Sequence, residues 1–271
     1  VTAFLVVSSQ ASLYGLFRIL FTLYGHLIQF SWLTFGWFLI VLGVLSMFVG
    51  VTMAIPQKDV KRLMAYHSVS QTGYMLLGLG VGLAVLGDRA ALAAYGKTAM
   101  AGGLFHLINN ALYKGLLFLT AGAIFLRTGT RNLNKLGGLG HAMPWTMGFF
   151  MIGALAIAGI PPFNGFASKL LIYESVFRFS PFLAIVAMIV SILTAASFVK
   201  VFHAMFMGAP RAEYAAVREV PAPMLAGMAL LTLFVVAAGL MPQPFIDHLI
   251  APAVDALVDR AGYVAAILGG N

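Results

Sequence analysis

The sequence predicts an all-α polytopic membrane protein with about seven transmembrane helices, one of which is discontinuous. Two observations predict this class. Of the 271 residues, 61% are hydrophobic and 9% are charged, and the mean hydropathy is +0.97, which is more apolar surface than a soluble core of this size can bury. The apolar residues also fall into runs long enough to cross a bilayer, separated by short connections.

The predicted spans follow one another closely along the chain. They cover residues 2–24, 32–55, 63–86, 100–126, 143–177, 181–207 and 223–241. The fifth span is expected to break, because Pro161-Pro162 removes two backbone N–H donors and disfavours helix at the residue before it. The carbonyl groups freed by the break need partners that lipid cannot supply, so this segment is expected to pack inside protein or to line a wet cavity.

Basic residues lie mainly in every second connection. The formal net charge is +8, but the scattering of the cations over short connections fits the positive-inside rule better than nucleic-acid binding. One side carries Lys58, Lys61, Arg62, Arg127, Arg131, Lys135, Arg211 and Arg218, and the other carries Arg89, Lys97, Arg178 and Arg260 with Asp247, Asp255 and Asp259. This bias predicts a cytoplasmic N-terminal end and a C-terminus outside.

The remaining composition excludes several kinds of site. There is no cysteine, so neither disulfides nor iron–sulfur ligation is expected within the chain, and the histidines are too widely spread for a metal site. No cofactor is predicted. The chain begins at Val1 without a charged leader, so it does not resemble a signal peptide and is expected to be the interior of a longer protein.

Lys169 is the first candidate functional residue. It follows Pro162 by about two helical turns and therefore lies close to the break, deep in the apolar layer. A snorkelling lysine with its amine at the interface is the alternative. Residues 170–177 stay largely apolar apart from Glu174 and Ser175, which favours a functional intramembrane amine.

The fourth span contains a second set of polar residues. His106, Asn110 and Lys114 are spaced i, i+4 and i+8, which places them on one helix face over two turns. A lone buried histidine is usually structural, but three polar groups in register favour a proton relay or an ion path.

Weaker signals lie elsewhere. Gln10, beside Ser9 in the first span, has an amide that needs partners and is expected to face inward. His67 and Gln71 near the start of the third span fit ordinary interfacial polarity as well as a role at a channel mouth. His203, close to Lys200, is expected to be a surface residue rather than a proton entrance.

Three stretches together resemble a known family. Residues 59–73, 106–119 and 158–169 resemble the antiporter-like, proton-translocating subunits of respiratory complex I (NADH-quinone oxidoreductase), of membrane-bound nickel–iron hydrogenases and of Mrp sodium/proton antiporters. The resemblance extends to about Met241 and implies the second half of a fold with two inverted five-helix repeats. Residues 1–30 would be the last helix of a first repeat, 31–208 a complete repeat, and 209–271 a final transmembrane helix and tail.

The resemblance also implies roles for single residues. Lys169 matches the terminal lysine or glutamate of the family's discontinuous helix, and His106 and Lys114 match its central axis. Gln10 stands where many relatives carry a lysine, and an amide cannot take up a proton near neutral pH, so the link at this point would run through water or through serines. The whole predicted proton pathway is Lys169, Lys114, His106, Asn110, Gln10, Ser9 and Glu174.

The function implied is proton translocation within a redox-driven complex, from the cytoplasm toward His106 and Lys114, then to Lys169 and outward. The partners would be other membrane subunits of that complex, in a bacterial or archaeal cytoplasmic membrane or another energy-coupling membrane. Two alternatives remain open: a subunit of an Mrp-type sodium/proton antiporter, and a scaffold without transport, which Gln10 motivates.

Overall fold

The chain folds entirely into helices. A computed structural model describes residues 2–23, 32–259, 262 and 265, and in these ranges no β-strand occurs beyond an isolated bridge between Asp59 and Asn132. The all-helical class predicted from the sequence is confirmed.

The helices follow the predicted order. The longer ones are α1 (Thr2–Arg18), α2 (Trp32–Ala54), α3 (Val60–Ala84), α5 (Lys97–Thr128), α6 (Pro144–Ala158), α7 (Asn164–Phe179), α8 (Pro181–Phe206) and α9 (Ala222–Leu240). A π-helical turn, Ile19–Leu23, extends α1, and α4 (Arg89–Ala91) with the π turn Leu92–Gly96 leads into α5. After α9 come α10 (Pro242–Phe245), the π turn Ile246–Ile250 and α11 (Ala251–Val258).

Four of the described helices are long and apolar enough to cross a membrane by length and composition: Thr34–Ala54, Arg89–Thr128, Pro181–Phe206 and Ala222–Leu240. The predicted number of seven spans is therefore not confirmed by this criterion. The physical reasons differ between the helices. The third predicted span, now α3, carries buried polar residues such as His67 and Gln71, and the fifth is divided into α6 and α7, of 15 and 16 residues.

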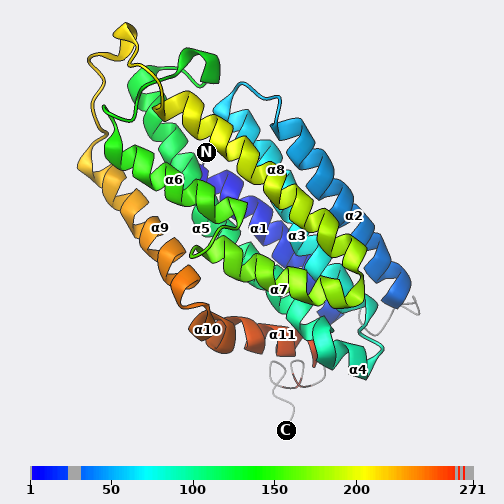
Figure 1. The fold of residues 1–271 in the computed structure, drawn as a ribbon. Helices are drawn as coiled ribbons and strands as arrows, with labels where there is room; N and C mark the ends of the chain where they lie inside the picture. The colour runs from blue at the N-terminus through cyan, green and yellow to red at the C-terminus, as the bar shows by residue number, and fades with distance from the viewer. Residues whose placement is uncertain (1, 24–31, 260–261, 263–264, 266–271) are drawn as a thin grey trace.

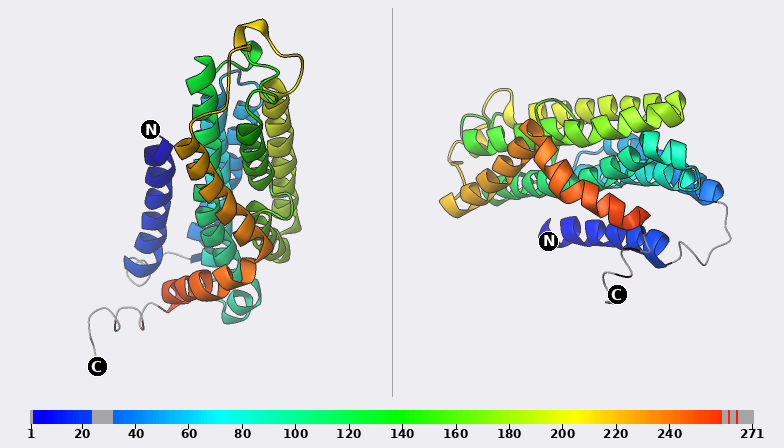
Figure 2. Two further views of the ribbon diagram at one scale, coloured as in Figure 1. Left: turned by 90° about the vertical axis from the view of Figure 1, so that its left-hand side faces the viewer. Right: turned by 90° about the horizontal axis from the view of Figure 1, so that it is seen from below.

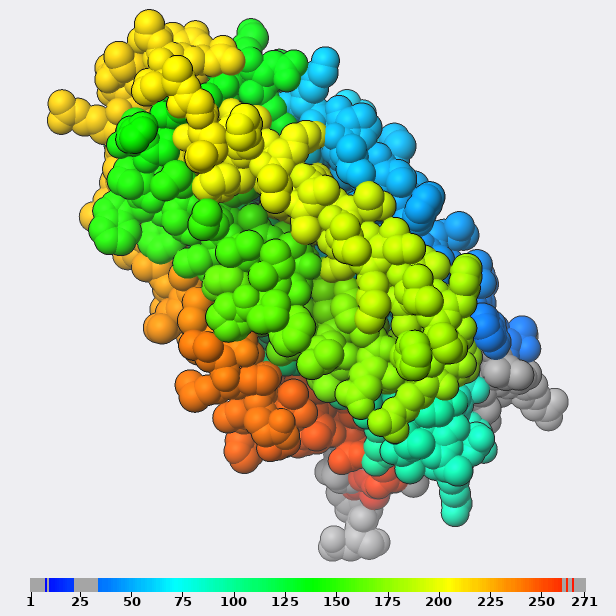
Figure 3. Space-filling model, in the orientation of Figure 1, coloured from blue at the N-terminus to red at the C-terminus, as the bar shows by residue number. Residues whose placement is uncertain are grey.

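The long helices run side by side in one bundle, with α5 in its middle. Helix α5 packs against α3, α6, α7 and α9, and Figure 1 and Figure 2 show α10 and α11 crossing one end of the bundle. The surface formed by α8, α6, α7 and α9 is seen face-on in Figure 3. Helices α2 and α3 meet backbone to backbone at Gly43 and Gly73, where a Cβ atom would overlap the opposite helix.

The predicted break in the fifth span is confirmed. Helix α6 ends at Ala158, and Gly159 takes a left-handed conformation (φ 76°) that lets Ile160 N–H bond back to the Leu155 carbonyl at 3.0 Å. The Pro161-Pro162 peptide is cis, and α7 begins at Asn164. The break is thus a capped helix end followed by a new helix.

The two ends of the bundle differ in charge. The connections α2–α3, α5–α6 and α8–α9 lie at the end that is uppermost in Figure 1, which we call the cationic end. It carries Lys58, Lys61, Arg62, Arg127, Arg131, Lys135, Lys200, Arg211 and Arg218 against Asp59, Glu213 and Glu219. In the described residues of the opposite end, acidic side chains are at least as frequent as basic ones.

Candidate functional site

The site is built around the carbonyl groups that the break leaves at the end of α6. Lys169 Nζ donates to the Ile157 carbonyl at 2.9 Å and to Ser191 Oγ at 2.9 Å, and Ser191 Oγ donates to the Ala158 carbonyl at 2.8 Å. Two side chains from α7 and α8 therefore satisfy acceptors that a helix terminus would otherwise leave unpaired. Lys169 is 1% exposed, so it is not a snorkelling lysine.

The Lys169 amine has no carboxylate partner among the described residues. The ion pairs in the described chain all lie at exposed positions and do not include it. Instead, Nζ lies 4.7 Å from the centroid of the Tyr74 ring, and Tyr74 is fixed by a 2.7 Å hydrogen bond from its hydroxyl to the Ala187 carbonyl. Carbonyl, hydroxyl and ring dipoles thus hold an amine that can gain or lose its proton without breaking a salt bridge.

His106 lies beside this amine, on α5. Its Nδ1 atom is 2.9 Å from Ser168 Oγ, and Ser168 directly precedes Lys169 in α7. Its Nε2 atom is 3.1 Å from Gln71 Oε1, and the Tyr113 hydroxyl lies 3.3 Å from both. All of these side chains are fully buried, so the imidazole joins groups from α3, α5 and α7.

Lys114 lies on the same side of α5, nearer the cationic end. Its Nζ atom donates to the Met64 carbonyl of α3 at 2.6 Å and lies 5.9 Å from the Phe118 ring centroid. The side chain is 2% exposed. Like Lys169, it is an amine held by a backbone carbonyl and an aromatic ring.

Helix α3 connects these groups. Met64, His67, Gln71 and Tyr74 are spaced by three, four and three residues, so they share one face over a rise of about 15 Å. We call the buried groups along this face and their partners the polar row: Lys114, His67, Ser197, Gln71, His106, Tyr113, Ser168, Lys169, Ser191 and Tyr74.

No hydrogen bond between described residues joins the other predicted pathway residues to the polar row. Asn110 and Gln10 are buried, but neither Asn110 Oδ1 nor Gln10 Oε1 has a hydrogen-bond partner in the described part of the chain. Glu174 is exposed and pairs with Arg178 at 3.3 Å. The side chain of Ser9 lies outside the described residues.

Helix α3 contributes more to the site than was expected from its sequence. His67 and Gln71 are fully buried in the bundle, so interfacial polarity does not account for them. The spacing of residues 64, 67, 71 and 74 is the sequence signal that identifies their shared face. Asn109, which the sequence did not single out, exchanges hydrogen bonds with Asn164 at the start of α7: its Nδ2 donates to the Asn164 carbonyl at 2.9 Å, and Asn164 Nδ2 donates to Asn109 Oδ1 at 3.1 Å. Ser191 stands in an apolar run that carries no pattern.

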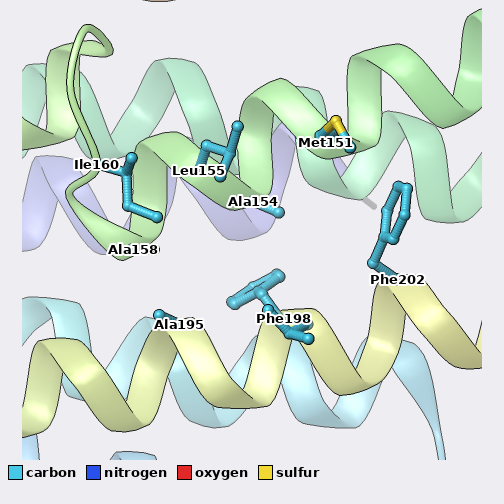
Figure 4. A pocket seen from close by; sticks show the side chains of 9 residues that line it. Met151, Ala154, Leu155, Ala158, Ile160, Ala195, Phe198 and Phe202 are labelled. Atoms are coloured by element: carbon cyan, nitrogen blue, oxygen red, sulfur yellow. The ribbon is translucent and has the colours of Figure 1, made fainter.

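An apolar groove lies between α6 and α8. Its volume is about 120 Å³, and only apolar side chains line it, among them Leu155, Ile160 and Phe198 (Figure 4). Phe198 is buried, and its ring centroid lies 4.9 Å from that of His67. This aromatic side chain therefore stands between the groove and the polar row.

The described residues bring no group of three or more His, Asp or Glu side chains together as a metal site. What the site offers is buried amines, imidazoles and hydroxyls, which are groups that exchange protons. A family profile described as "NADH:quinone oxidoreductase/Mrp antiporter, TM" matches residues 1–194. The chain belongs to this family. The resemblance stated from the three sequence stretches is thereby confirmed.

Individual members of the NADH:quinone oxidoreductase/Mrp antiporter family agree with this assignment. The chain is 36% identical to formate hydrogenlyase subunit 3 of Escherichia coli (strain K12) over 235 residues, which cover 82% of this chain and 38% of that protein. In the solved Mrp complex of a Dietzia species, a subunit superposes with a TM-score of 0.82 at 27% identity, over 96% of this chain and 53% of that one.

Respiratory complex I of Thermus thermophilus contains a third relative in this family. There the TM-score is 0.73 at 28% identity, over 84% of this chain and 45% of that one. The chain thus spans about a third to a half of the length of the relatives it matches. It is a helical membrane protein of the antiporter-like type.

Proposed function

We propose that this chain translocates protons across the membrane as an antiporter-like subunit of a redox-driven complex of the complex I or membrane-bound hydrogenase kind. The observation that carries the proposal is the polar row, which contains two buried amines, Lys114 and Lys169, together with buried hydrogen-bonding side chains between them. Charged groups in an apolar interior are costly and are kept mainly where they carry ions or protons. Neither amine is neutralised by a carboxylate in the described chain, so each can change charge during a cycle.

The proposed mechanism is electrostatic. A proton on one buried amine disfavours a proton on the next, because charges interact strongly where water is scarce. A proton entering from the cationic end would reach Lys114 first. It would then pass to His106 and the side chains bonded to it, and would displace a proton from Lys169 toward the other end. The partner subunits would supply the charge that starts each cycle.

The proposed topology has seven spans, with α6 and α7 forming one discontinuous span and α10 and α11 lying along the membrane surface. The cationic end would face the cytoplasm, because basic connections are retained there. This puts the N-terminal end in the cytoplasm and the C-terminus outside. The partners would be other membrane subunits of the same complex.

A second candidate function is proton/sodium exchange within an Mrp-type antiporter. The TM-score of 0.82 against the Mrp complex favours it. The two functions differ in their driving force, so membrane vesicles energised by the redox reaction and vesicles given a sodium gradient separate them. A scaffold without transport is the third possibility, motivated by Gln10, and it requires both assays to be insensitive to changes in the polar row.

The decisive experiment replaces Lys169 in the complete complex. Lys169→Ala is expected to abolish proton translocation, and Lys169→Gln tests whether hydrogen bonding alone suffices, since an amide can donate to Ile157 and Ser191 but cannot carry a proton near neutral pH. Lys97→Ala is the matched control, because Lys97 is an exposed lysine paired with Asp255 at 2.7 Å. Normal translocation by both Lys169 variants would overturn the proposal.

A further inference from the structure

His67 is a buried imidazole that the pathway above does not use. It is 0% exposed on α3, and its Nε2 atom lies 2.9 Å from Ser197 Oγ of α8. Its Nδ1 atom has no hydrogen-bond partner in the part of the chain that the structure describes. Buried polar atoms usually have a hydrogen-bond partner, so this ring nitrogen is available to a proton donor or acceptor other than the described side chains.

The position of His67 matters more than its burial. One turn before it on α3 is Met64, whose carbonyl accepts from Lys114 at 2.6 Å. One turn after it is Gln71, which contacts His106 Nε2 at 3.1 Å. His67 therefore lies midway along the α3 face between the two halves of the polar row.

Those two halves are not otherwise joined. Lys114 and His106 are eight residues apart on α5, a rise of about 12 Å, and no hydrogen bond in the described chain connects them directly. A proton moving from one to the other needs an intermediate group that can accept and release it. Among the side chains of the α3 face, the imidazole of His67 is the group with that chemistry.

His67 faces the polar row on one side, and an aromatic side chain covers it on the side of the apolar groove. Phe198 packs against the ring, 4.9 Å between centroids, and separates it from the apolar groove. The charged groups that interact with it electrostatically are Lys114, Lys169 and Lys200. In the described chain, these charged groups are the two amines of the polar row and a lysine of the cationic end, and no carboxylate among them would fix an imidazolium in place.

We propose that His67 is the proton-carrying link between Lys114 and His106, with Ser197 as the residue that positions its ring. This inference rests on the proposed function. In the step, an N–H bond of the Lys114 ammonium breaks as an N–H bond forms on one ring nitrogen, through a bridging water, and the other ring nitrogen then releases its proton toward His106. The imidazole returns to its neutral form, and no electrons are transferred.

The test compares His67→Gln with Ser70→Ala in the complete complex. Glutamine keeps hydrogen bonding to Ser197 but cannot relay a proton near neutral pH, so proton translocation is expected to fall by about tenfold or more. Ser70 is the matched control: it is equally buried on α3, but its hydroxyl donates to the Met47 carbonyl at 3.0 Å, away from the polar row. Ser70→Ala is expected to translocate at nearly the rate of the unmodified complex.

Two further variants separate proton transfer from packing. His67→Glu restores a titratable group and is expected to recover part of the rate lost in His67→Gln, which a packing role does not predict. Ser197→Thr keeps the hydroxyl, so its rate of proton translocation is expected to be higher than that of Ser197→Ala. The yield of assembled complex is measured for each variant. If His67→Glu does not assemble, the comparison of His67→Gln with Ser70→Ala still tests whether His67 carries the proton.

The outcomes are distinguishable from failure of the proposed function. If Lys169→Ala and Lys169→Gln stop translocation while His67→Gln matches Ser70→Ala, the link through His67 is wrong and the proposed function stands. If the Lys169 variants translocate normally, both ideas fail. A tenfold loss in His67→Gln with partial recovery in His67→Glu supports the link.

Discussion

The amine of Lys169 donates a hydrogen bond to the carbonyl oxygen of Ile157, 2.9 Å away across the helix break. The residue proposed to carry a proton therefore also caps the end of α6. The favourable interaction of a cation with a helix C-terminus depends on its charge, so protonation of Lys169 and the stability of the break are linked. A neutral amine would hold the end of α6 less strongly than an ammonium.

Ser191 is expected to share this capping role. Ser191→Ala removes the donor to the Ala158 carbonyl and an acceptor from Lys169, so it is expected to lower the free energy of unfolding by about 1–3 kcal/mol. Thermal unfolding of the purified complex measures the loss. Ser175→Ala is the control, because among the described residues the Ser175 hydroxyl donates only to carbonyl groups of its own helix. Equal stability of the two variants would show that Ser191 does not stabilise the end of α6.

Gly159 is expected to tolerate no side chain. Its φ of 76° disfavours other residues, and a Cβ atom there would lie 2.8 Å from Lys169 Cδ. Gly159→Ala is therefore expected to cost about 1–3 kcal/mol of stability and to displace the Lys169 side chain, so that proton translocation falls together with unfolding temperature. Gly148→Ala, within α6 and with open space around it, serves as the control. Wild-type translocation in Gly159→Ala would contradict the close contact.

The sequence predicted the fold through features that act locally. Apolar runs fixed the order of the helices, and Pro161-Pro162 fixed the break, because both consequences follow from backbone chemistry alone. The buried state of Lys169 followed from its distance to the break. These elements depend on a few neighbouring residues, which is why a single sequence sufficed to predict them.

The partners of the site residues could not be predicted in the same way. Ser191 meets Lys169 from 22 residues away, and Gln71 meets His106 from 35, and such contacts depend on how helices pack. On the expected face of His106, Asn110 and Lys114, Asn110 Oδ1 has no hydrogen-bond partner among the described residues, whereas His67 and Gln71 of α3, which the pattern did not single out, are buried beside it. The burial of His67 and Gln71 likewise depends on α8 and α5 covering that face.

Neighbouring asparagines on α5 are expected to behave differently. Asn109 holds the start of α7 through two hydrogen bonds with Asn164, whereas Asn110 Oδ1 has no partner in the described chain. Asn109→Ala is expected to destabilise the complex by about 1–3 kcal/mol, and Asn110→Ala by less. Thermal unfolding of both variants checks this, and a larger loss in Asn110→Ala would show that the asparagine next in sequence holds the break.

Gln10 offers a test of whether the first helix takes part in transport. Gln10 is 7% exposed on α1, and its Oε1 atom has no hydrogen-bond partner in the described residues. Gln10→Lys introduces a group that can take up a proton where an amide cannot. If protons pass this position, the rate of translocation in the complete complex is expected to change. Thr52→Lys, an exposed substitution near the end of α2, controls for the added charge. If Gln10→Lys and the unmodified complex translocate protons at the same rate, the first helix lies outside the pathway. If neither complex translocates protons although both assemble, the scaffold function is favoured.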